Sequence, residues 1–134
     1  MSVSLARSKY KQMEAAAAPD IESPYKVVLV TLTELERSLA VLVAARSQER
    51  NLPDEHFNRC FTAIYILQSS LDFEKGGELS NRLFEVYEYC RIQVLNAFKR
   101  DENSDLEQAR MAVEGIKSAW IEIGSQVESR ATRH

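Results

Sequence analysis

The sequence has no long hydrophobic run and no excess of positive charge. Its longest apolar stretch, LAVLVAA at residues 39–45, is too short to cross a bilayer. Seventeen Lys and Arg stand against 20 Asp and Glu, which gives a net charge of −3 at pH 7. Because nucleic-acid binding relies on a surplus of Lys and Arg, we expect neither nucleic-acid binding nor direct membrane insertion.

Cysteine is almost as scarce as tryptophan. The two cysteines, Cys60 and Cys90, belong to no CxxC pair and to no zinc-ligand spacing. The first 19 residues carry charges at positions 7, 9, 11 and 14 and have no apolar core of a secretory signal. We therefore expect a reducing cytosol, with both thiols as small core residues; a reactive thiol is the alternative.

Histidine is equally rare, which bears on catalysis. The chain has two histidines, His56 and the terminal His134, and no ExxH pair that could build a di-metal site in a helical bundle. No Ser or Cys has a candidate base partner. The sequence therefore predicts a protein that is not an enzyme and that needs no cofactor or metal.

Apolar residues recur at helical spacing in four stretches, and no stretch alternates long enough to form a strand. The expected helices cover about residues 24–46, about 53–73, from the glycine pair to about 98, and from Ser104 onward. The four stripes are Val28, Leu32, Leu35, Leu39 and Leu42; Phe57, Cys60, Ile64, Leu67 and Leu71; Leu79, Leu83, Val86, Cys90, Val94 and Ala97; and Leu106, Ala109, Val113, Ile116, Trp120 and Ile123.

Two helix starts carry capping residues. Ser23 can accept from a free backbone N–H of the first turn, and Pro24 suits the first helical position because it has no N–H to lose. Ser104, with Glu107 three residues later, has the pattern of a capping box. We therefore expect one helix to begin after Ser23 and another after Ser104.

These elements predict an all-α fold. Short polar connections favour antiparallel neighbours, so we expect an up-down four-helix bundle. Pro19 and Pro24 separate an N-terminal arm, residues 1–22, which can include a short helix in its alanine run. The bundle domain is expected over residues 23–126, and residues 127–134 are expected to form a disordered C-terminal tail.

The adjacent glycines Gly76 and Gly77 allow two interpretations, a phosphate cradle or a structural turn. A phosphate loop has a Lys and a Ser or Thr after its glycines, whereas Lys75 precedes this pair and Glu78 follows it. The carboxylate of Glu78 in a first helical turn would repel phosphate. We therefore expect a structural turn in which Gly76, in the left-handed conformation, ends the second helix and Gly77 and Glu78 begin the third.

The stretch LDFEKGGELSNRLFEVYEY, residues 71–89, resembles the flagellin-specific export chaperones, the FliS family. The corresponding stretch of that family reads approximately LDxExGGEIAxNLxxLYxYM. The resemblance extends to Ser23-Pro24, to Ala119-Trp120 and, in the arm, to Tyr10. It implies a cytosolic chaperone that binds the C-terminal segment of flagellin, prevents premature polymerisation and delivers flagellin to the flagellar type III export apparatus. The cytoplasmic domain of the export gate is a second partner that it allows.

Aromatic residues beside the main stripes widen the apolar face, as expected of a groove for an amphipathic client segment. For any stripe residue, core packing is the alternative interpretation. Tyr10 can contact the export gate or form the tip of an arm that covers the groove. A helical interaction module or homodimer without flagellin specificity is the alternative function. The expected partner-binding residues are Tyr10, Val28, Leu32, Phe61, Ile64, Tyr65, Leu83, Tyr87, Tyr89 and Val94.

Overall fold

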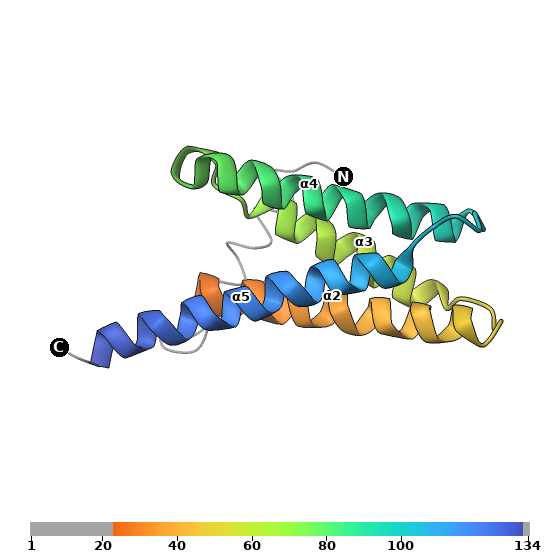
Figure 1. Ribbon diagram of the computed structural model, residues 1–134, viewed down its shortest axis with the longest axis horizontal. Coiled ribbons are helices and arrows are strands. Elements are labelled where there is room, and N and C mark those ends of the chain that lie inside the picture. Colours follow the sequence, from red (N-terminus) through yellow and green to blue (C-terminus); the bar gives the residue numbers. More distant parts are fainter. Residues whose placement is uncertain (1–22, 133–134) are drawn as a thin grey trace.

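The computed structural model describes the backbone of residues 23–132 and the side chains of residues 23–125 (Figure 1). These residues form four helices: α2 (Pro24–Ser47), α3 (Asp54–Ser69), α4 (Phe73–Phe98) and α5 (Leu106–Thr132). Residues 23–132 contain no strand, which confirms the all-α class. The arm, residues 1–22, lies outside the described residues, and so does Tyr10 within it.

Each helix packs against two others. Helix α2 contacts α3 and α5, and α4 contacts the same two helices. Figure 1 shows successive helices running in opposite directions along the long axis of the molecule. At the end where α4 begins and α5 finishes, these two helices diverge, whereas α2 and α5 stay side by side.

The start of α2 is as predicted. The Ser23 side chain accepts from the backbone N–H of Lys26 at 3.2 Å, and Pro24 occupies the first turn. Four leucines of the first stripe are 0% exposed and line one side of the core: Leu32, Leu35, Leu39 and Leu42. Spacing by three and four residues therefore does identify the buried face of this helix.

The two cysteines lie inside the core, as expected from the sequence. Both Cys60 and Cys90 are 0% exposed and free of disulfide bonds. Burial raises the pKa of each thiol from 9.0 to about 12, because the thiolate would lose its hydration. The pKa of the neighbouring core residue Tyr87 rises to about 12 for the same reason.

The boundary between α3 and α4 differs from the prediction. Helix α3 ends at Ser69 rather than near residue 73, and α4 already begins at Phe73, before the glycines. The Asp72 carboxylate caps α4 by accepting from the backbone N–H groups of Glu74 (3.1 Å) and Lys75 (3.0 Å). The prediction that Gly76 ends the second helix is wrong, because α3 stops at Ser69 and Asp72 caps a new helix four residues before Gly76. The helical backbone is nevertheless broken at the glycine pair, at Gly77.

Both glycines still have structural roles, but Gly77 has the unusual backbone. Its φ of 50° and ψ of −124° make a kink inside α4, whereas the φ of Gly76 is not positive. The backbone N–H of Gly76 donates to the Asp72 carbonyl at 2.8 Å, and the hydroxyl of Ser80 donates to the same carbonyl at 2.9 Å from the other side of the kink. A Cβ on Gly76 would overlap with the Ser80 hydroxyl.

Substitution of the two glycines separates these roles. Gly77→Ala should lower the free energy of unfolding by about 1 kcal/mol, because a Cβ is strained at positive φ. Most of the cost of Gly76→Ala should come from the overlap with the Ser80 hydroxyl, so the cost should fall in a Ser80→Ala background. Urea denaturation followed by circular dichroism measures both. A larger cost for Gly76→Ala than for Gly77→Ala in that background would contradict this assignment.

Helix α5 also begins and ends differently from the prediction. Asp105 rather than Ser104 caps it, since the Asp105 carboxylate accepts from the backbone N–H of Gln108 at 2.9 Å. The helix continues to Thr132, so the predicted disordered tail is wrong for residues 127–132. Residues 125–132 contain no Pro or Gly that would stop a helix. Residues 133–134 lie outside the described part of the chain.

The Ser104 hydroxyl is engaged elsewhere. It donates to the Asp101 carbonyl at 2.9 Å and accepts from Arg46, which reaches it from the end of α2. The Arg46 guanidinium also donates to the carbonyls of Ser104 (2.9 Å), Glu102 (3.0 Å) and Asp101 (3.2 Å). Arg46 thus holds the turn between α4 and α5 against α2.

Candidate functional site

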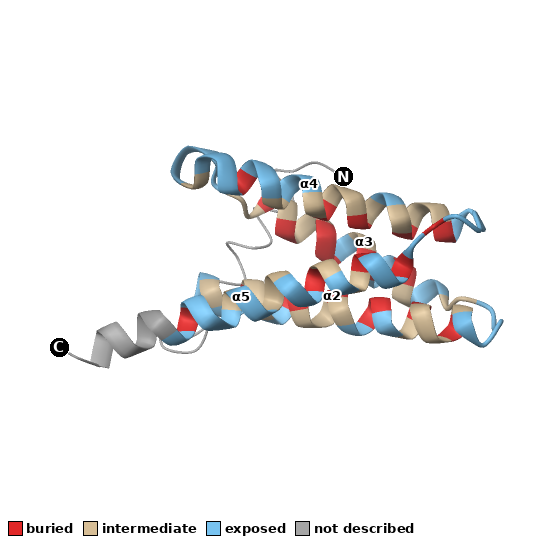
Figure 2. Cartoon of the chain, in the orientation of Figure 1, coloured by how far each residue is buried: buried red, intermediate tan, exposed pale blue. Residues whose placement is uncertain are grey.

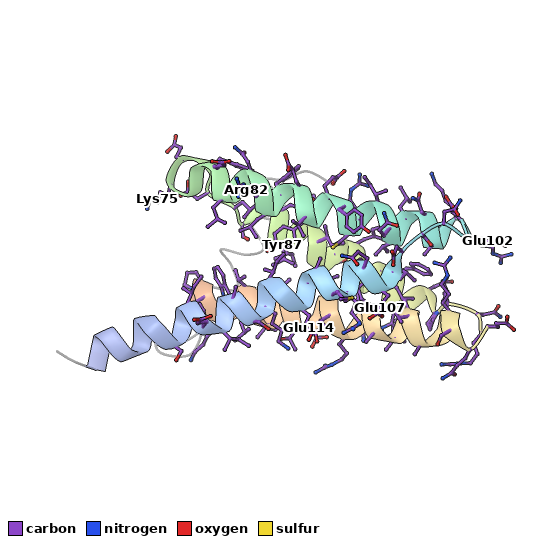
Figure 3. All side chains as sticks on the ribbon, viewed as in Figure 1. Lys75, Arg82, Tyr87, Glu102, Glu107 and Glu114 are labelled. Carbon is purple, nitrogen blue, oxygen red and sulfur yellow. The ribbon has the colours of Figure 1, made fainter. Side chains whose placement is uncertain are left out.

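Four of the predicted partner-binding residues lie in the core. They are at most 3% exposed and pack among the core leucines, so a partner could reach them only if the helices separated. Figure 3 shows Tyr87 on the side of α4 that faces the other helices, whereas the side chain of Arg82 on the same helix is 73% exposed. The four are Leu32, Ile64, Tyr87 and Val94.

Five other predicted residues are half-buried and come from three helices. Four of them pack against the edge of the core: Val28, Phe61, Leu83 and Tyr89. The fifth, Tyr65 on α3, has a hydroxyl shielded from solvent with no hydrogen-bond partner among the described residues. Their role in partner binding stays a prediction.

The structure instead forms a groove along the outer side of the α2–α3 pair, which we call the α2–α3 groove. Its volume is about 530 Å³, within the usual range of roughly 300–1,000 Å³ for binding pockets. It is lined by Val30, Thr31 and Glu34 of α2 and by Glu55, Asn58, Arg59, Thr62, Ala63 and Ile66 of α3.

The chemical character of the α2–α3 groove changes along its length. One end holds Val30, which is 57% exposed, and Ile66. The other end holds two carboxylates, each in an ion pair with an Arg of its own helix: Glu34 with Arg37 at 3.1 Å and Glu55 with Arg59 at 2.5 Å. The groove is therefore apolar at one end and charged at the other.

A second apolar region lies at the end of the molecule where α4 and α5 diverge. Leu79 on α4 is 62% exposed and Ile123 on α5 is 48% exposed, although the sequence predicted both as part of core stripes. That prediction is wrong because the two helices separate before these positions, as Figure 1 shows. Figure 2 shows exposed residues in the first turns of α4.

Two aromatic pairs lie near the same end. Phe73 and Phe84, on either side of the kink in α4, have ring centroids 6.2 Å apart, and both are substantially exposed. Tyr25 and Trp120 stack with centroids 5.4 Å apart and join α2 to α5. The indole N–H of Trp120 donates to the Tyr25 carbonyl at 3.0 Å, and the Tyr25 hydroxyl donates to the Trp120 carbonyl at 2.9 Å.

The Tyr25–Trp120 pair depends on a small residue one turn further along α5. A Cβ at Gly124 would overlap with the hydroxyl end of the Tyr25 ring. Tyr25 follows Ser23 and Pro24 directly, so the described part of the chain begins beside Trp120. Residues that the sequence marked at opposite ends of the chain are thus neighbours in the fold.

Sequence reasoning missed Val30, Ile66, Phe73 and Phe84. Each is a large apolar residue outside the stripe of its own helix, and that position is the signal that could have identified it. A stripe marks what a helix buries against its neighbours. Val30, Phe73 and Phe84 are off-stripe side chains that lie at the surface.

The described part of the chain contains neither a metal-binding cluster nor a membrane-spanning helix. Within residues 23–125 no group of three His, Cys, Asp or Glu residues could hold a metal ion. Among the four described helices, none is apolar enough over a sufficient length to span a bilayer.

The chain matches known proteins over nearly its whole length. The family model described as flagellar protein FliS matches residues 6–127. The flagellar secretion chaperone FliS of Campylobacter jejuni is 31% identical over 92% of this chain and 94% of its own length. That of Vibrio cholerae is 26% identical over 85% of each chain, and flagellar secretion chaperone FliSB of Pseudomonas aeruginosa is 25% identical over 86% of this chain and 92% of its own. No solved structure matches. The chain belongs to the FliS family of flagellar secretion chaperones.

Proposed function

We propose that this protein is a cytosolic chaperone that binds the disordered C-terminal segment of flagellin and prevents its premature polymerisation. It then delivers flagellin to the flagellar type III export apparatus, where the cytoplasmic domain of the export gate is a second partner. The observation that carries the proposal is the family match over residues 6–127. The exposed apolar surface supports it, because a client helix needs such surface to dock. The function includes no catalytic step.

The same proposal gives each part of the chain a role. The four helices serve as an antiparallel up-down bundle, and residues 1–22 serve as a separable arm. The contacts of α2 and α4 with both α3 and α5 support the bundle arrangement. The client folds as it binds, which takes roughly 2–5 kcal/mol from the gross interaction free energy and suits a client that must be released at the export gate.

A titration of the purified protein with a peptide of the flagellin C-terminal segment tests the function. We expect saturable binding by calorimetry and a gain in helical circular dichroism beyond the sum of the two components. A peptide of the same composition in scrambled order is the matched control. If both peptides give the same heat and no added helicity, the protein is not a flagellin chaperone.

The arm leads to a separate prediction. It is joined to Ser23, the first described residue, which lies close to the Tyr25–Trp120 pair at the end of the molecule where Leu79 and Ile123 are exposed. An arm that covers this apolar surface lowers the apparent client affinity by the fraction of time for which it is closed. Deletion of residues 1–22 should therefore tighten binding of the flagellin peptide several-fold while the helices stay folded.

Peptide titration and pull-down of the export-gate cytoplasmic domain distinguish the two roles of Tyr10. Equal dissociation constants with and without the arm, together with weaker gate binding, would exclude the covering role and leave Tyr10 as a gate contact. Weaker peptide binding without the arm would instead make the arm part of the client site. Tyr10→Ala should reproduce the change in peptide affinity if Tyr10 covers the client surface, and the loss of gate binding if Tyr10 contacts the gate.

A further inference from the structure

A pocket separate from the α2–α3 groove lies between the α2–α3 turn and the end of α4, and we call it the turn pocket. Its volume is about 640 Å³. In Figure 1 the α2–α3 and α4–α5 turns lie at the end of the molecule opposite to the diverging ends of α4 and α5. The pocket is therefore far from the exposed apolar residues at that other end. Its lining includes Arg50, Leu52, Asp54, Phe57, Phe98 and Arg100.

Arg50 and Arg100 differ from the other arginines of the described side chains, residues 23–125. Arg46 binds the turn that precedes α5, and the remaining arginines form ion pairs with a glutamate of their own helix. Neither Arg50 nor Arg100 forms an ion pair with a described carboxylate. Arg50 donates from Nε to the Gln48 side chain at 2.7 Å, which leaves its two terminal amino groups unused. Both guanidiniums therefore have donors available to an anion from outside.

The backbone fixes the positions of both arginines. The N–H of Arg50 donates to the Ala45 carbonyl at 2.8 Å, and the N–H of Arg100 donates to the Ala97 carbonyl at 3.0 Å. Arg100 has a φ of 64°, a conformation that glycine usually provides after the end of a helix. A strained residue of this kind is a pointer to function. Because the turns are already ordered, an anion that binds there orders little more than the two side chains.

An exposed aromatic side chain adjoins the two guanidiniums. Phe98 is 54% exposed, and its ring packs edge-on against the buried ring of Phe57 with centroids 5.3 Å apart. The lining contains one carboxylate, that of Asp54, and the acidic residues Asp101 and Glu102 of the next turn lie outside it. The pocket thus combines an excess of positive charge with an apolar surface. Arginine and aromatic side chains are the types enriched at protein interfaces.

We propose that the turn pocket is a docking site for an acidic segment of a protein partner other than the client. Two carboxylates of that segment accept from Arg50 and Arg100, and an apolar side chain next to them covers Phe98. The two unpaired guanidiniums select carboxylates and repel a basic segment. The exposed ring favours a protein segment over a free phosphate, which would leave Phe98 in contact with water. This inference goes beyond the proposed function and does not depend on flagellin binding.

A fluorescein-labelled synthetic peptide with two adjacent glutamates followed by a phenylalanine tests the pocket by fluorescence anisotropy. We expect saturable binding to the full-length protein at low salt, and weaker binding as salt is added. Arg50→Gln and Arg100→Gln should each weaken binding roughly fivefold. Asp54→Asn should tighten binding about twofold, because a carboxylate of the lining no longer repels the peptide. Lys99→Gln removes a positive charge beside Arg100 but outside the lining, so this matched control should change binding by less than about twofold.

Several outcomes would overturn the proposal. The first is the absence of saturable binding, and the second is equal binding by the two arginine variants and the unmodified protein. The third is equal binding of a peptide with glutamines in place of both glutamates. Displacement of the acidic peptide by an equal concentration of inorganic phosphate would identify a phosphate site instead, and displacement by the flagellin C-terminal peptide would make the pocket part of the client site. Circular dichroism verifies that each variant is folded.

Discussion

Raising the pH from about 8 to about 10.5 should lower the free energy of unfolding by on the order of 4 kcal/mol. The reason is the two core thiols, Cys60 and Cys90, whose pKa is raised from 9.0 to about 12 in the folded protein. In the unfolded chain both thiols lose their protons above pH 9, whereas the folded chain keeps them. The unfolded state is then favoured by about 1.4 kcal/mol per thiol for each pH unit in this window.

The direction of the effect follows from the proton count. Between pH 9 and 12 the folded state binds more protons than the unfolded state, so stability falls as pH rises. Below pH 9 both thiols are protonated in both states, and their stabilising contribution is fully present. Tyr87 acts in the same direction between pH 10 and 12. Urea denaturation at several pH values, with a reductant present, measures the effect.

A double substitution provides the control. Cys60→Ala with Cys90→Ala should cost some stability at pH 7, because core volume is lost. It should also remove most of the alkaline slope, since only Tyr87 of the three groups then remains. Equal slopes for the two proteins would show that the core thiols do not cause the loss.

Replacement of the single tryptophan should have the second large effect. Trp120→Ala is expected to lower the free energy of unfolding by about 3 kcal/mol, because it removes the stacked ring and the indole hydrogen bond to the Tyr25 carbonyl. The change also leaves the Tyr25 ring without its partner on α5. Hydrogen exchange should show the loss as faster exchange at the start of α2 and in α5 around Gly124.

Two matched substitutions separate the ring from its N–H group. Trp120→Phe keeps an aromatic ring against Tyr25 but loses the indole donor and part of the stacked area, so it should cost about 1 kcal/mol. Met111→Ala, at an exposed site on the same helix, should change stability by less than about 0.5 kcal/mol. A cost for Trp120→Ala no larger than that for Met111→Ala would mean that the pair does not stabilise the bundle.

Much of the fold can be predicted from the sequence because its helices follow local rules. Ser23 and Pro24 mark the start of α2 through chemistry within one turn, and spacing by three and four residues identifies the core leucines. The glycine pair misleads because glycine commonly ends a helix, whereas here the nearby Asp72 provides the earlier cap. Ser104 misleads for a different reason: its hydroxyl binds Arg46, 58 residues away in the sequence.

The candidate site is harder to predict because it depends on how the helices pack. Leu32 and Val30 are two residues apart on α2, yet one is 0% exposed and the other 57%. Which off-stripe side chains face each other across a pair of helices depends on helix rotation and register. The His56–Ser38 contact reveals that register, and no local pattern in either helix encodes it. Sequence alone therefore favoured stripe residues, four of which lie in the core.

The Tyr25–Trp120 contact also constrains the order of events while the chain is being made. Its two residues are 95 positions apart in the sequence. At a synthesis rate of roughly 5–20 residues per second, Trp120 is added about 5–20 s after Tyr25. During that interval the leucines of α2 lack the cover that α5 later provides. A nascent chain of this chaperone therefore exposes apolar surface of its own, and a message truncated before Trp120 would yield a product prone to aggregation rather than a smaller working bundle.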